Sequence, residues 1–263
     1  MDYYAGIDVG SATTKAVVVD GDGGILGRAL SPTGVSGAEV AGTVLDRALA
    51  EAGATRGDLR SVVATGYGRE LVPFADSRVT EITCHARGAF ARIGQELTLI
   101  DIGGQDTKAV AVGPSGKVER FLMNDRCAAG TGRFLEVMAR ALETDLAHLA
   151  ALSLEAERGV KISSMCTVFA ESEVVSLLAR GTPRGEIARG LHRGVAERAG
   201  GLAKKVGLRG EVYLSGGVAF NPAVAAALGE FLNLVVRVIP EPQLNGAYGA
   251  ALIALDGAWI HRQ

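Results

Sequence analysis

Two of the three cysteines in this chain stand where a helix is expected to begin. Cys127 lies in the glycine-rich stretch "NDRCAAGTGRFLE" (124–136), and Cys166 directly precedes an expected helix, 167–181. Partial positive charge at a helix N-terminus favours a thiolate, and thiolates bind zinc and iron–sulfur clusters. Such a centre takes about four thiolates, so one chain offers half a set and a two-fold dimer would complete it. On spacing alone, the favoured interpretation is two small buried apolar side chains, the usual role of free cysteine.

The third cysteine and the histidines lack ligand spacing. Cys84 stands in "EITCHARGA" with no partner nearby, so we expect it to pack in the core. The four histidines are scattered and form no H-E-x-x-H motif, which gives a zinc hydrolase no support. So few cysteines, far apart and without an export signal, indicate reduced thiols in a cytoplasmic protein.

The chain also contains an internal repeat with candidate functional residues. Residues 7–25, "IDVGSATTKAVVVDGDGGI", align with residues 100–118, "IDIGGQDTKAVAVGPSGKV". Each copy is typical of a β-hairpin in which an apolar strand ends in Asp-x-Gly and a second strand leads into a glycine-rich turn. Aspartate and glycine disfavour strands, so breaks at the same place in both copies indicate loops with a function. The duplication predicts two related lobes.

These loops suit polyphosphate binding. Glycines let backbone N–H groups approach phosphate oxygens, and the hydroxyls of Ser11 and Thr13 can donate further hydrogen bonds. Asp8 and Asp101, at the strand ends, could hold Mg²⁺ partly through its waters. Lys15 either reaches a phosphate or is a surface lysine. The Walker pattern is absent, which excludes a P-loop site, and "LSGGVAFN" (214–221) is a third glycine-rich turn that could hold a nucleoside.

The remaining elements alternate between strand and helix, which predicts an α/β fold. Helical spacing covers 37–53, 131–151, 167–181, 185–206 and 245–260. Strands are expected in 59–71, which runs into a loop, in the strand–turn–helix segment 211–232, and in "NLVVRVIP" (233–240). We expect a first lobe at 1–95, a second lobe with both ligand cysteines at 96–244, and a closing helix at 245–263 that returns to the first lobe.

Composition narrows the functional classes. The 263 residues are 48% hydrophobic and carry a formal net charge of −2, so neither nucleic acid nor an anionic membrane is an expected partner. The N-terminal "MDYYAGIDVG" is unlike a signal peptide. The longest charge-free run is broken by "SGG" and "NP", which argues against a membrane span.

Over nearly its full length the chain resembles the ATPase activators of 2-hydroxyacyl-CoA dehydratases and benzoyl-CoA reductases. The motifs that carry the resemblance run in order: "GIDVGSATTKAV", "ATGYGRE", "EITCHARGAF", "DIGGQDTKAV", "MNDRCAAGTGRFLEVMA", "CTVFAESEVVSLLARG", "SGGVAFN" and "NGAYGAAL". The resemblance implies the acetate kinase/sugar kinase/Hsp70/actin architecture, with two ribonuclease-H-like lobes and nucleotide in the cleft. It also implies a homodimer bridged by one 4Fe–4S cluster.

Carried over residue by residue, the resemblance assigns roles to individual side chains. Cys127 and Cys166 would bind the iron, Asp8 and Asp101 would face magnesium, and Gln105 or Asp106 would orient the attacking water. ATP or ADP would be bound by Asp8, Gly10, Ser11, Ala12, Thr13, Thr14, Lys15, Asp101, Gly103, Gly104, Gln105, Asp106, Gly216, Gly217, Val218, Ala219, Phe220 and Gln243. A ferredoxin or flavodoxin would donate the electron, and a dehydratase or CoA-ester reductase would accept it.

Three alternatives stay open at this point. A sugar or acyl kinase of the same fold would use the cysteines only for packing, but the chain is short and shows no obvious catalytic-base aspartate. A nucleotide-dependent chaperone or filament protein would need a peptide-binding domain or an assembly surface, and neither is evident. An ATPase that reduces a different double-cluster protein cannot be separated from the dehydratase activator by sequence, because that specificity lies in the partner.

Overall fold

The computed structural model describes residues 2–125, 127–163 and 166–260, with the side chains of 258–260 not described. The chain divides into two compact units. Unit 1 comprises residues 1–96, 112–119 and 243–263, and unit 2 comprises 97–111 and 120–242. The expected lobe boundaries fell at 95/96 and 244/245, and the structure additionally groups the turn at 112–119 with unit 1.

Unit 1 is a five-stranded sheet with the order β3-β2-β1-β4-β5. The strands are β1 (Tyr3–Val9), β2 (Thr13–Val19), β3 (Ile25–Pro32), β4 (Leu59–Thr65) and β5 (Ser77–Arg78). β1 pairs antiparallel with β2 and parallel with β4, and β2 pairs antiparallel with β3. The helices are α1 (Gly37–Glu51), α2 (Glu81–Ile93) and α8 (Asn245–Ile260), with short 3-10 turns at Arg56–Asp58 and Arg69–Leu71.

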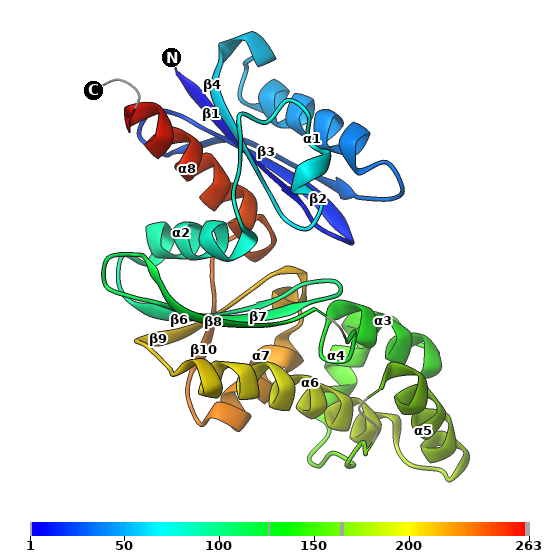
Figure 1. Ribbon diagram of the computed structural model, residues 1–263. Helices are drawn as coiled ribbons and strands as arrows, with labels where there is room; N and C mark the ends of the chain where they lie inside the picture. Colours follow the sequence, from blue (N-terminus) through cyan, green and yellow to red (C-terminus); the bar gives the residue numbers. More distant parts are fainter. Residues whose placement is uncertain (1, 126, 164–165, 261–263) are drawn as a thin grey trace. The chain divides into compact units, whose positions relative to one another are not determined.

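Alternation along the strands builds a core on each face of this sheet. Ile7 and Val9 pack with α1, whereas Tyr4 and Val17 pack with α8, so the two helices cover opposite faces (Figure 1). Gly6 permits the close approach of α8, because a Cβ there would lie 2.0 Å from the Ala247 carbonyl oxygen. The strand that ends in Asp8 is thus held from both faces.

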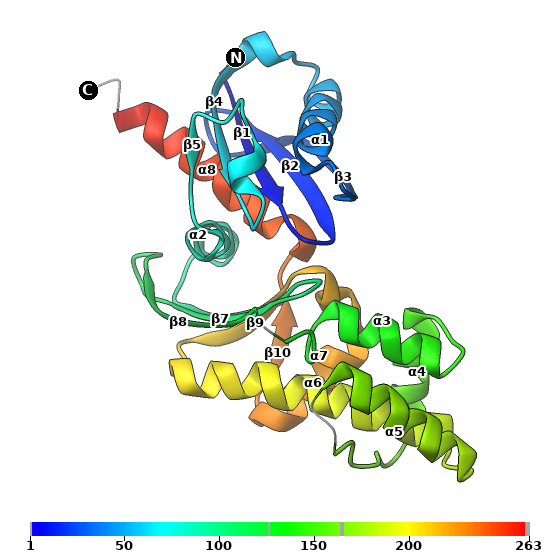
Figure 2. The same ribbon diagram turned by 45° about the vertical axis from the view of Figure 1, so that its right-hand side comes forward.

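Unit 2 repeats the same sheet order, β10-β9-β6-β7-β8. Its strands are β6 (Leu97–Ile102), β7 (Thr107–Val112), β8 (Val118–Asn124), β9 (Glu211–Ser215) and β10 (Val236–Val238). Its helices are α3 (Gly132–Ala141), α4 (Leu146–Glu155), α5 (Thr167–Ala179), α6 (Arg184–Val206) and α7 (Pro222–Leu232), with 3-10 turns at Gly217–Phe220 and Pro242–Leu244. One apolar cluster joins β6, β7 and β9 to these helices. In both views α3, α4 and α5 gather at one end of α6 (Figures 1 and 2).

The predicted hairpins are present as β1–β2 and β6–β7, and each continues into a third strand that the sequence pattern did not identify. The expected helix 131–151 is two helices, because Glu143 has a positive φ of 50° and Asp145 caps α4 through the His148 N–H. Helix α2 was missed, since "EITCHARGA" was interpreted only as the surroundings of a packing cysteine. Within the described part of the chain, no helix is both long and apolar enough to span a bilayer.

Candidate nucleotide-binding and cysteine sites

Asp8 stands at the end of β1, directly opposite Lys15 on β2. The Lys15 ammonium lies 3.1 Å from Asp8 Oδ2, and only 12% of the lysine side chain is exposed. The alternative of a surface lysine is therefore wrong, because antiparallel pairing brings this residue across from the carboxylate. The pair fixes a nearly buried carboxylate beside the first loop.

The loop from Gly10 to Thr13 is closed by its own hairpin. The Gly10 N–H donates to the Thr13 carbonyl at 3.1 Å, and Thr33, just after β3, donates from its N–H to Ala12 and from its hydroxyl to Gly10. The hydroxyls of Thr14 and Thr33 lie 2.9 Å apart. Ser11 and Ala12 remain exposed at the tip, where the Ser11 hydroxyl and the loop N–H groups can meet an anion.

Two glycines that the sequence analysis did not assign shape the surroundings of Asp8. A Cβ on Gly66, whose φ is 88°, would lie 2.5 Å from Asp8 Oδ1. A Cβ on Gly246 would lie 3.1 Å from Asp8 Oδ2 and 2.7 Å from His85 Nε2. Both glycines stand inside the motifs "ATGYGRE" and "NGAYGAAL", so the signal was present, but only the fold brings them to the carboxylate.

Asp101 occupies the corresponding place at the end of β6. Its Oδ1 accepts a hydrogen bond from the Ser215 hydroxyl at 2.7 Å, and its Oδ2 lies 3.4 Å from the Lys108 ammonium. Lys108 also lies 2.6 Å from Asp106 Oδ2 and is itself only 2% exposed. A buried ammonium between two carboxylates fixes the orientation of both.

The second loop presents an amide and a carboxylate where the first presents hydroxyls. The Gly103 N–H donates to the Asp106 carbonyl at 2.9 Å, as Gly10 does to Thr13. Gln105 is exposed, and 25% of the Asp106 side chain is exposed. The two residues therefore reach solvent from a loop whose backbone is fixed, as required of groups that orient a water molecule.

This second loop is hydrogen-bonded to the segment that carries Cys127. The N–H groups of Gly132 and Arg133, in the first turn of α3, donate to the carbonyls of Gly103 and Gly104, each at 2.9 Å. The buried Thr107 hydroxyl donates to the Gly130 carbonyl at 2.9 Å. The second loop and the start of α3 thus form one hydrogen-bonded structure inside unit 2.

Cys127 lies in the loop before α3 rather than at the helix terminus. Thr131 is the N-cap residue and α3 begins at Gly132, which confirms the expected start of this helix near residue 131. Cys127 precedes that cap in the sequence and is not itself part of the helix terminus. The Cys127 carbonyl accepts from the Asn124 amide at 3.1 Å, and the sulfur lies 3.9 Å from Arg198 Nη1. The half-buried thiol therefore has a guanidinium, not a helix end, beside it.

Cys166 is the N-cap residue of α5, as predicted. Its carbonyl accepts the Ala170 N–H at 2.8 Å, and its side chain is exposed. Helix α5 packs beside α3, so both cysteine-bearing segments belong to the same end of unit 2 (Figure 2). Among the described residues, no three His, Cys, Asp or Glu side chains form a group that could hold a metal ion.

Cys84 packs in the core of unit 1, as expected. It is fully buried on α2 among residues of β1, β2 and α8. Burial raises the pKa of the Cys84 thiol to about 12, so this sulfur stays protonated near neutral pH. That environment distinguishes it from the two accessible cysteines of unit 2.

The third glycine-rich turn follows β9. Gly216 has a φ of 84°, and a Cβ there would lie 2.3 Å from the Ile102 carbonyl oxygen and 3.0 Å from Asp101 Oδ1. In the next turn of the chain, Gly217 and Phe220 are exposed while Val218 and Ala219 are buried. The structure thus brings the 216–220 turn beside Asp101 within unit 2, and Gln243 is half-buried at the start of the last segment of unit 1.

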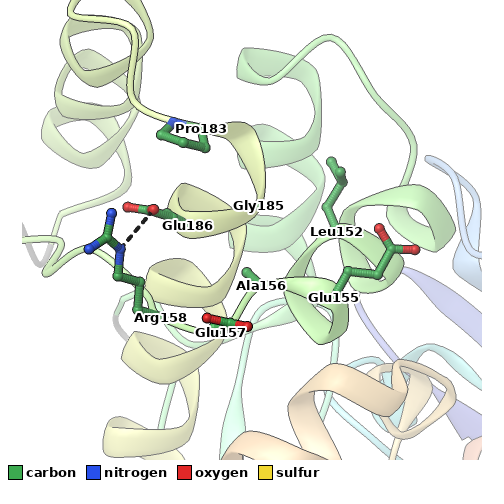
Figure 3. Close-up of a pocket in the computed structure, with 8 residues that line it drawn as sticks. All are labelled: Leu152, Glu155, Ala156, Glu157, Arg158, Pro183, Gly185 and Glu186. Atoms are coloured by element: carbon green, nitrogen blue, oxygen red, sulfur yellow. Dashed lines mark hydrogen bonds and ion pairs between the residues drawn. The ribbon is translucent and has the colours of Figure 1, made fainter.

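A separate open pocket of about 470 Å³ lies between the end of α4 and the start of α6 (Figure 3). The one cation among the described residues that line it, Arg158, is paired with Glu186 at 2.9 Å. The pocket contains none of the predicted site residues, and its surplus of carboxylates would repel a polyphosphate. It is lined by Leu152, Glu155, Ala156, Glu157, Arg158, Pro183, Gly185 and Glu186.

Comparison with known proteins matches these features to one family. The model of the BadF/BadG/BcrA/BcrD ATPase family matches residues 5–254. The activator of lactoyl-CoA dehydratase from Anaerotignum propionicum is 48% identical, with 97% of this chain and 98% of that protein aligned.

Solved structures agree. Component A of the (R)-2-hydroxyglutaryl-CoA dehydratase of Acidaminococcus fermentans superposes with a TM-score of 0.93 at 43% identity, covering 98% of this chain and 100% of that one. The activator of the 2-hydroxyisocaproyl-CoA dehydratase from Clostridium difficile, with bound ADPNP, gives 0.91 at 42% identity, covering 99% and 97%. A glucokinase from Streptomyces griseus gives 0.57 at 18% identity, covering 97% and 100%, which shows the sugar-kinase fold alone. The predicted two-lobed architecture is confirmed.

Proposed function

The chain belongs to the BadF/BadG/BcrA/BcrD ATPase family, and from that premise we propose that it activates a 2-hydroxyacyl-CoA dehydratase, or a related CoA-ester reductase, by ATP-driven electron transfer. Relatives that match nearly the whole chain are named activators of such dehydratases, and one solved relative holds the ATP analogue ADPNP. A reduced ferredoxin or flavodoxin would supply the electron in the cytoplasm.

We assign the binding of MgATP to both duplicated loops and the 216–220 turn, together with Gln243. The support is chemical, because each loop combines a fixed glycine-containing backbone with a buried Asp–Lys pair. Asp8 and Asp101 fit a hydrated Mg²⁺, since each offers carboxylate oxygens and this ion keeps most of its waters. The magnesium would offset phosphate charge as the leaving group departs.

Gln105 and Asp106 are the residues we assign to the attacking water. Phosphoryl transfer needs little covalent chemistry from the protein, so a side chain that orients water is sufficient. Gln105 is exposed at the loop tip, and Asp106 is oriented by Lys108 at 2.6 Å. The first loop has Ala12 and Thr13 in these places. Their backbone N–H groups and the Thr13 hydroxyl can donate to phosphate, but neither side chain is a carboxylate that could accept a proton from water.

Cys127 and Cys166 are the proposed ligands of one 4Fe–4S cluster shared by two copies of the chain. Cys166 is exposed and Cys127 is half-buried, and each has a source of positive potential nearby: Arg198 for Cys127 and the start of α5 for Cys166. Such surroundings fit thiolate ligands. When bound, the cluster would supply one-electron transfer, and two thiolates per chain would complete its usual set of about four.

Exposed apolar side chains flank both cysteines and support burial by a second copy. Phe121, Leu122 and Met123 precede Cys127 on the edge strand β8. Val168 and Phe169, in the first turn of α5 after Cys166, are 66% and 67% exposed. Exposed apolar groups concentrated around a functional residue are typical of an interaction site, so we place the homodimer contact at this end of unit 2.

The observation that carries the proposal is the direct hydrogen bonding between the second loop and the Cys127 segment. The carbonyls of Gly103 and Gly104 accept from the start of α3, and the Thr107 hydroxyl bonds to Gly130. A phosphate that displaces the loop must therefore strain or move the backbone next to Cys127. A nucleotide is coupled to a distant site when it binds one conformation of the protein more tightly than another. Here the two conformations would differ in the positions of the second loop and of the backbone next to Cys127.

Anaerobic purification with iron and sulfide analysis tests the proposal. We expect a coloured dimer with one cluster per two chains, and loss of the cluster in Cys127→Ser and in Cys166→Ser with ATP affinity nearly unchanged. Cys84→Ala is the matched control, since it removes a thiol buried in the core of unit 1. An iron-free wild-type protein, a monomer with a full cluster, or a serine variant with an unchanged spectrum would contradict the assignment.

A further inference from the structure

Arg198, on α6, lies against the Cys127 loop. Its Nη1 is 3.9 Å from Cys127 Sγ and donates to the Ala129 carbonyl at 3.2 Å. No motif singled out this arginine, and the role proposed above for the cysteines does not require it. One guanidinium nitrogen thus contacts both the sulfur and the backbone two residues later.

The fold places the arginine there through its aliphatic stem as well. Gly130 has a φ of 89°, and a Cβ on it would lie 3.0 Å from Arg198 Cδ and 3.3 Å from Arg198 Cβ. The absence of a side chain at Gly130 therefore lets the loop backbone rest on the stem. Because α6 is anchored in the apolar core of unit 2 through Val195 and Ala199, the guanidinium has a fixed base.

Positive charge and hydrogen bonds at a ligand sulfur stabilise the reduced form of an iron–sulfur cluster, because reduction adds negative charge. We propose that Arg198 is a positioning residue that holds the Cys127 loop and raises the reduction potential of the cluster bound there. This inference rests on the proposed ligand role of Cys127. The inference applies to the Cys127 sulfur only, because Cys166 lies elsewhere, at the N-cap of α5.

The test is a dye-equilibrated redox titration of the iron-loaded protein without nucleotide. In Arg198→Gln we expect the ratio of reduced to oxidised cluster at a fixed potential to fall about tenfold, which corresponds to about 59 mV for one electron. Arg193→Gln is the matched control, since it removes the same charge from the same helix at an exposed arginine that pairs with Glu230 at 3.7 Å. The control should change the ratio less than twofold.

Arg198→Lys keeps the charge on a side chain without the planar fork, so its potential should lie between those of wild type and Arg198→Gln. If the glutamine variant does not fold, the lysine variant alone should still show a lowered potential. An unchanged potential in the variants that fold, or an equal shift in Arg193→Gln, would overturn the inference. Absence of iron from the wild type would instead count against the proposed function.

Discussion

Units 1 and 2 each contain one copy of the duplicated hairpin. They differ most in the segment that connects the third strand of the sheet to the next long helix. In unit 1 only residues 33–36 separate β3 from α1, whereas in unit 2 residues 125–183 separate β8 from α6. That longer connection contains α3, α4 and α5 together with Cys127 and Cys166. The same sheet topology therefore carries a short connection on one side and the whole cysteine-bearing segment on the other.

The hydrogen bonds show what the difference means. In unit 1 the Gly10 carbonyl and the Thr14 hydroxyl are both bonded by Thr33, the residue directly after β3. In unit 2 the matching Gly103 carbonyl is bonded by Gly132, and the matching Thr107 hydroxyl is bonded to Gly130. The first loop is closed on itself, and the second is closed by the cysteine-bearing segment. Of the two duplicated loops, only the second is therefore connected by hydrogen bonds to the backbone near Cys127.

The largest difference is expected at the two lysines. Lys108→Met would leave the buried Asp101 carboxylate without its ammonium and should lower the free energy of unfolding by about 3–5 kcal/mol. Lys15→Met removes a more accessible partner and should cost about 1–3 kcal/mol. Urea denaturation of both variants measures the two losses in the free energy of unfolding. Equal losses would contradict the claim that the Asp101–Lys108 pair stabilises the fold more than the Asp8–Lys15 pair.

At the aspartates the difference should appear in turnover. Asp101→Asn is expected to lower Mg²⁺-dependent ATP hydrolysis on the order of 100-fold, because a charge that faces the transition state is lost. Asp8→Asn should also reduce turnover, and both variants should keep their cluster spectrum. Wild-type hydrolysis by Asp101→Asn would remove that residue from the site.

The threonines offer the most selective comparison. Thr107→Val and Thr14→Val each remove one buried hydroxyl, so each should destabilise the fold by about 1 kcal/mol. MgATP should change the rate at which a chelator removes iron from the wild type and from Thr14→Val. In Thr107→Val this effect of MgATP should be at most half as large, because the hydrogen bond to Gly130 is lost. An equal loss of this effect in both variants would show that the connection does not run through Gly130.

The smallest expected effect is in the response to acid. Burial lowers the pKa of His192, whose ring bonds to the Ala188 carbonyl and to the Asn221 amide at the N-cap of α7. Since the unfolded chain binds this proton more readily, the free energy of unfolding should fall as the pH drops below about 6.5. His192→Gln should flatten that slope in urea denaturation between about pH 7 and pH 5. An identical slope would assign the acid sensitivity to other groups.

Local patterns predicted much of this molecule. The repeat between residues 7–25 and 100–118 was sufficient to predict both hairpins, and the glycine-rich turn after β9 was visible in "LSGGVAFN". Contacts between distant residues could not be predicted this way. The arrangement of Gly66 and Gly246 around Asp8, and of Arg198 at Cys127, depends on chain segments that meet only in the folded sheet and helix layers.

The errors have the same origin. The start of α3 near residue 131 was predicted correctly, but the positive charge beside Cys127 was attributed to that helix because its actual neighbour, Arg198, is distant in the sequence. Lys15 was ambiguous because its partner is defined by strand register. Helix α2 was missed because "EITCHARGA" was interpreted only around its cysteine, and because Gly88, which allows close packing against α8, disfavours a helix.

The coupling of nucleotide to cysteine is tested most directly by electron paramagnetic resonance of the reduced, iron-loaded dimer with and without MgATP. If the second loop and the Cys127 segment move together, MgATP should change the cluster spectrum of the wild type and change it much less in Thr107→Val. A wild-type spectrum that is the same with and without MgATP, in a protein that hydrolyses ATP and holds its cluster, would contradict the coupling.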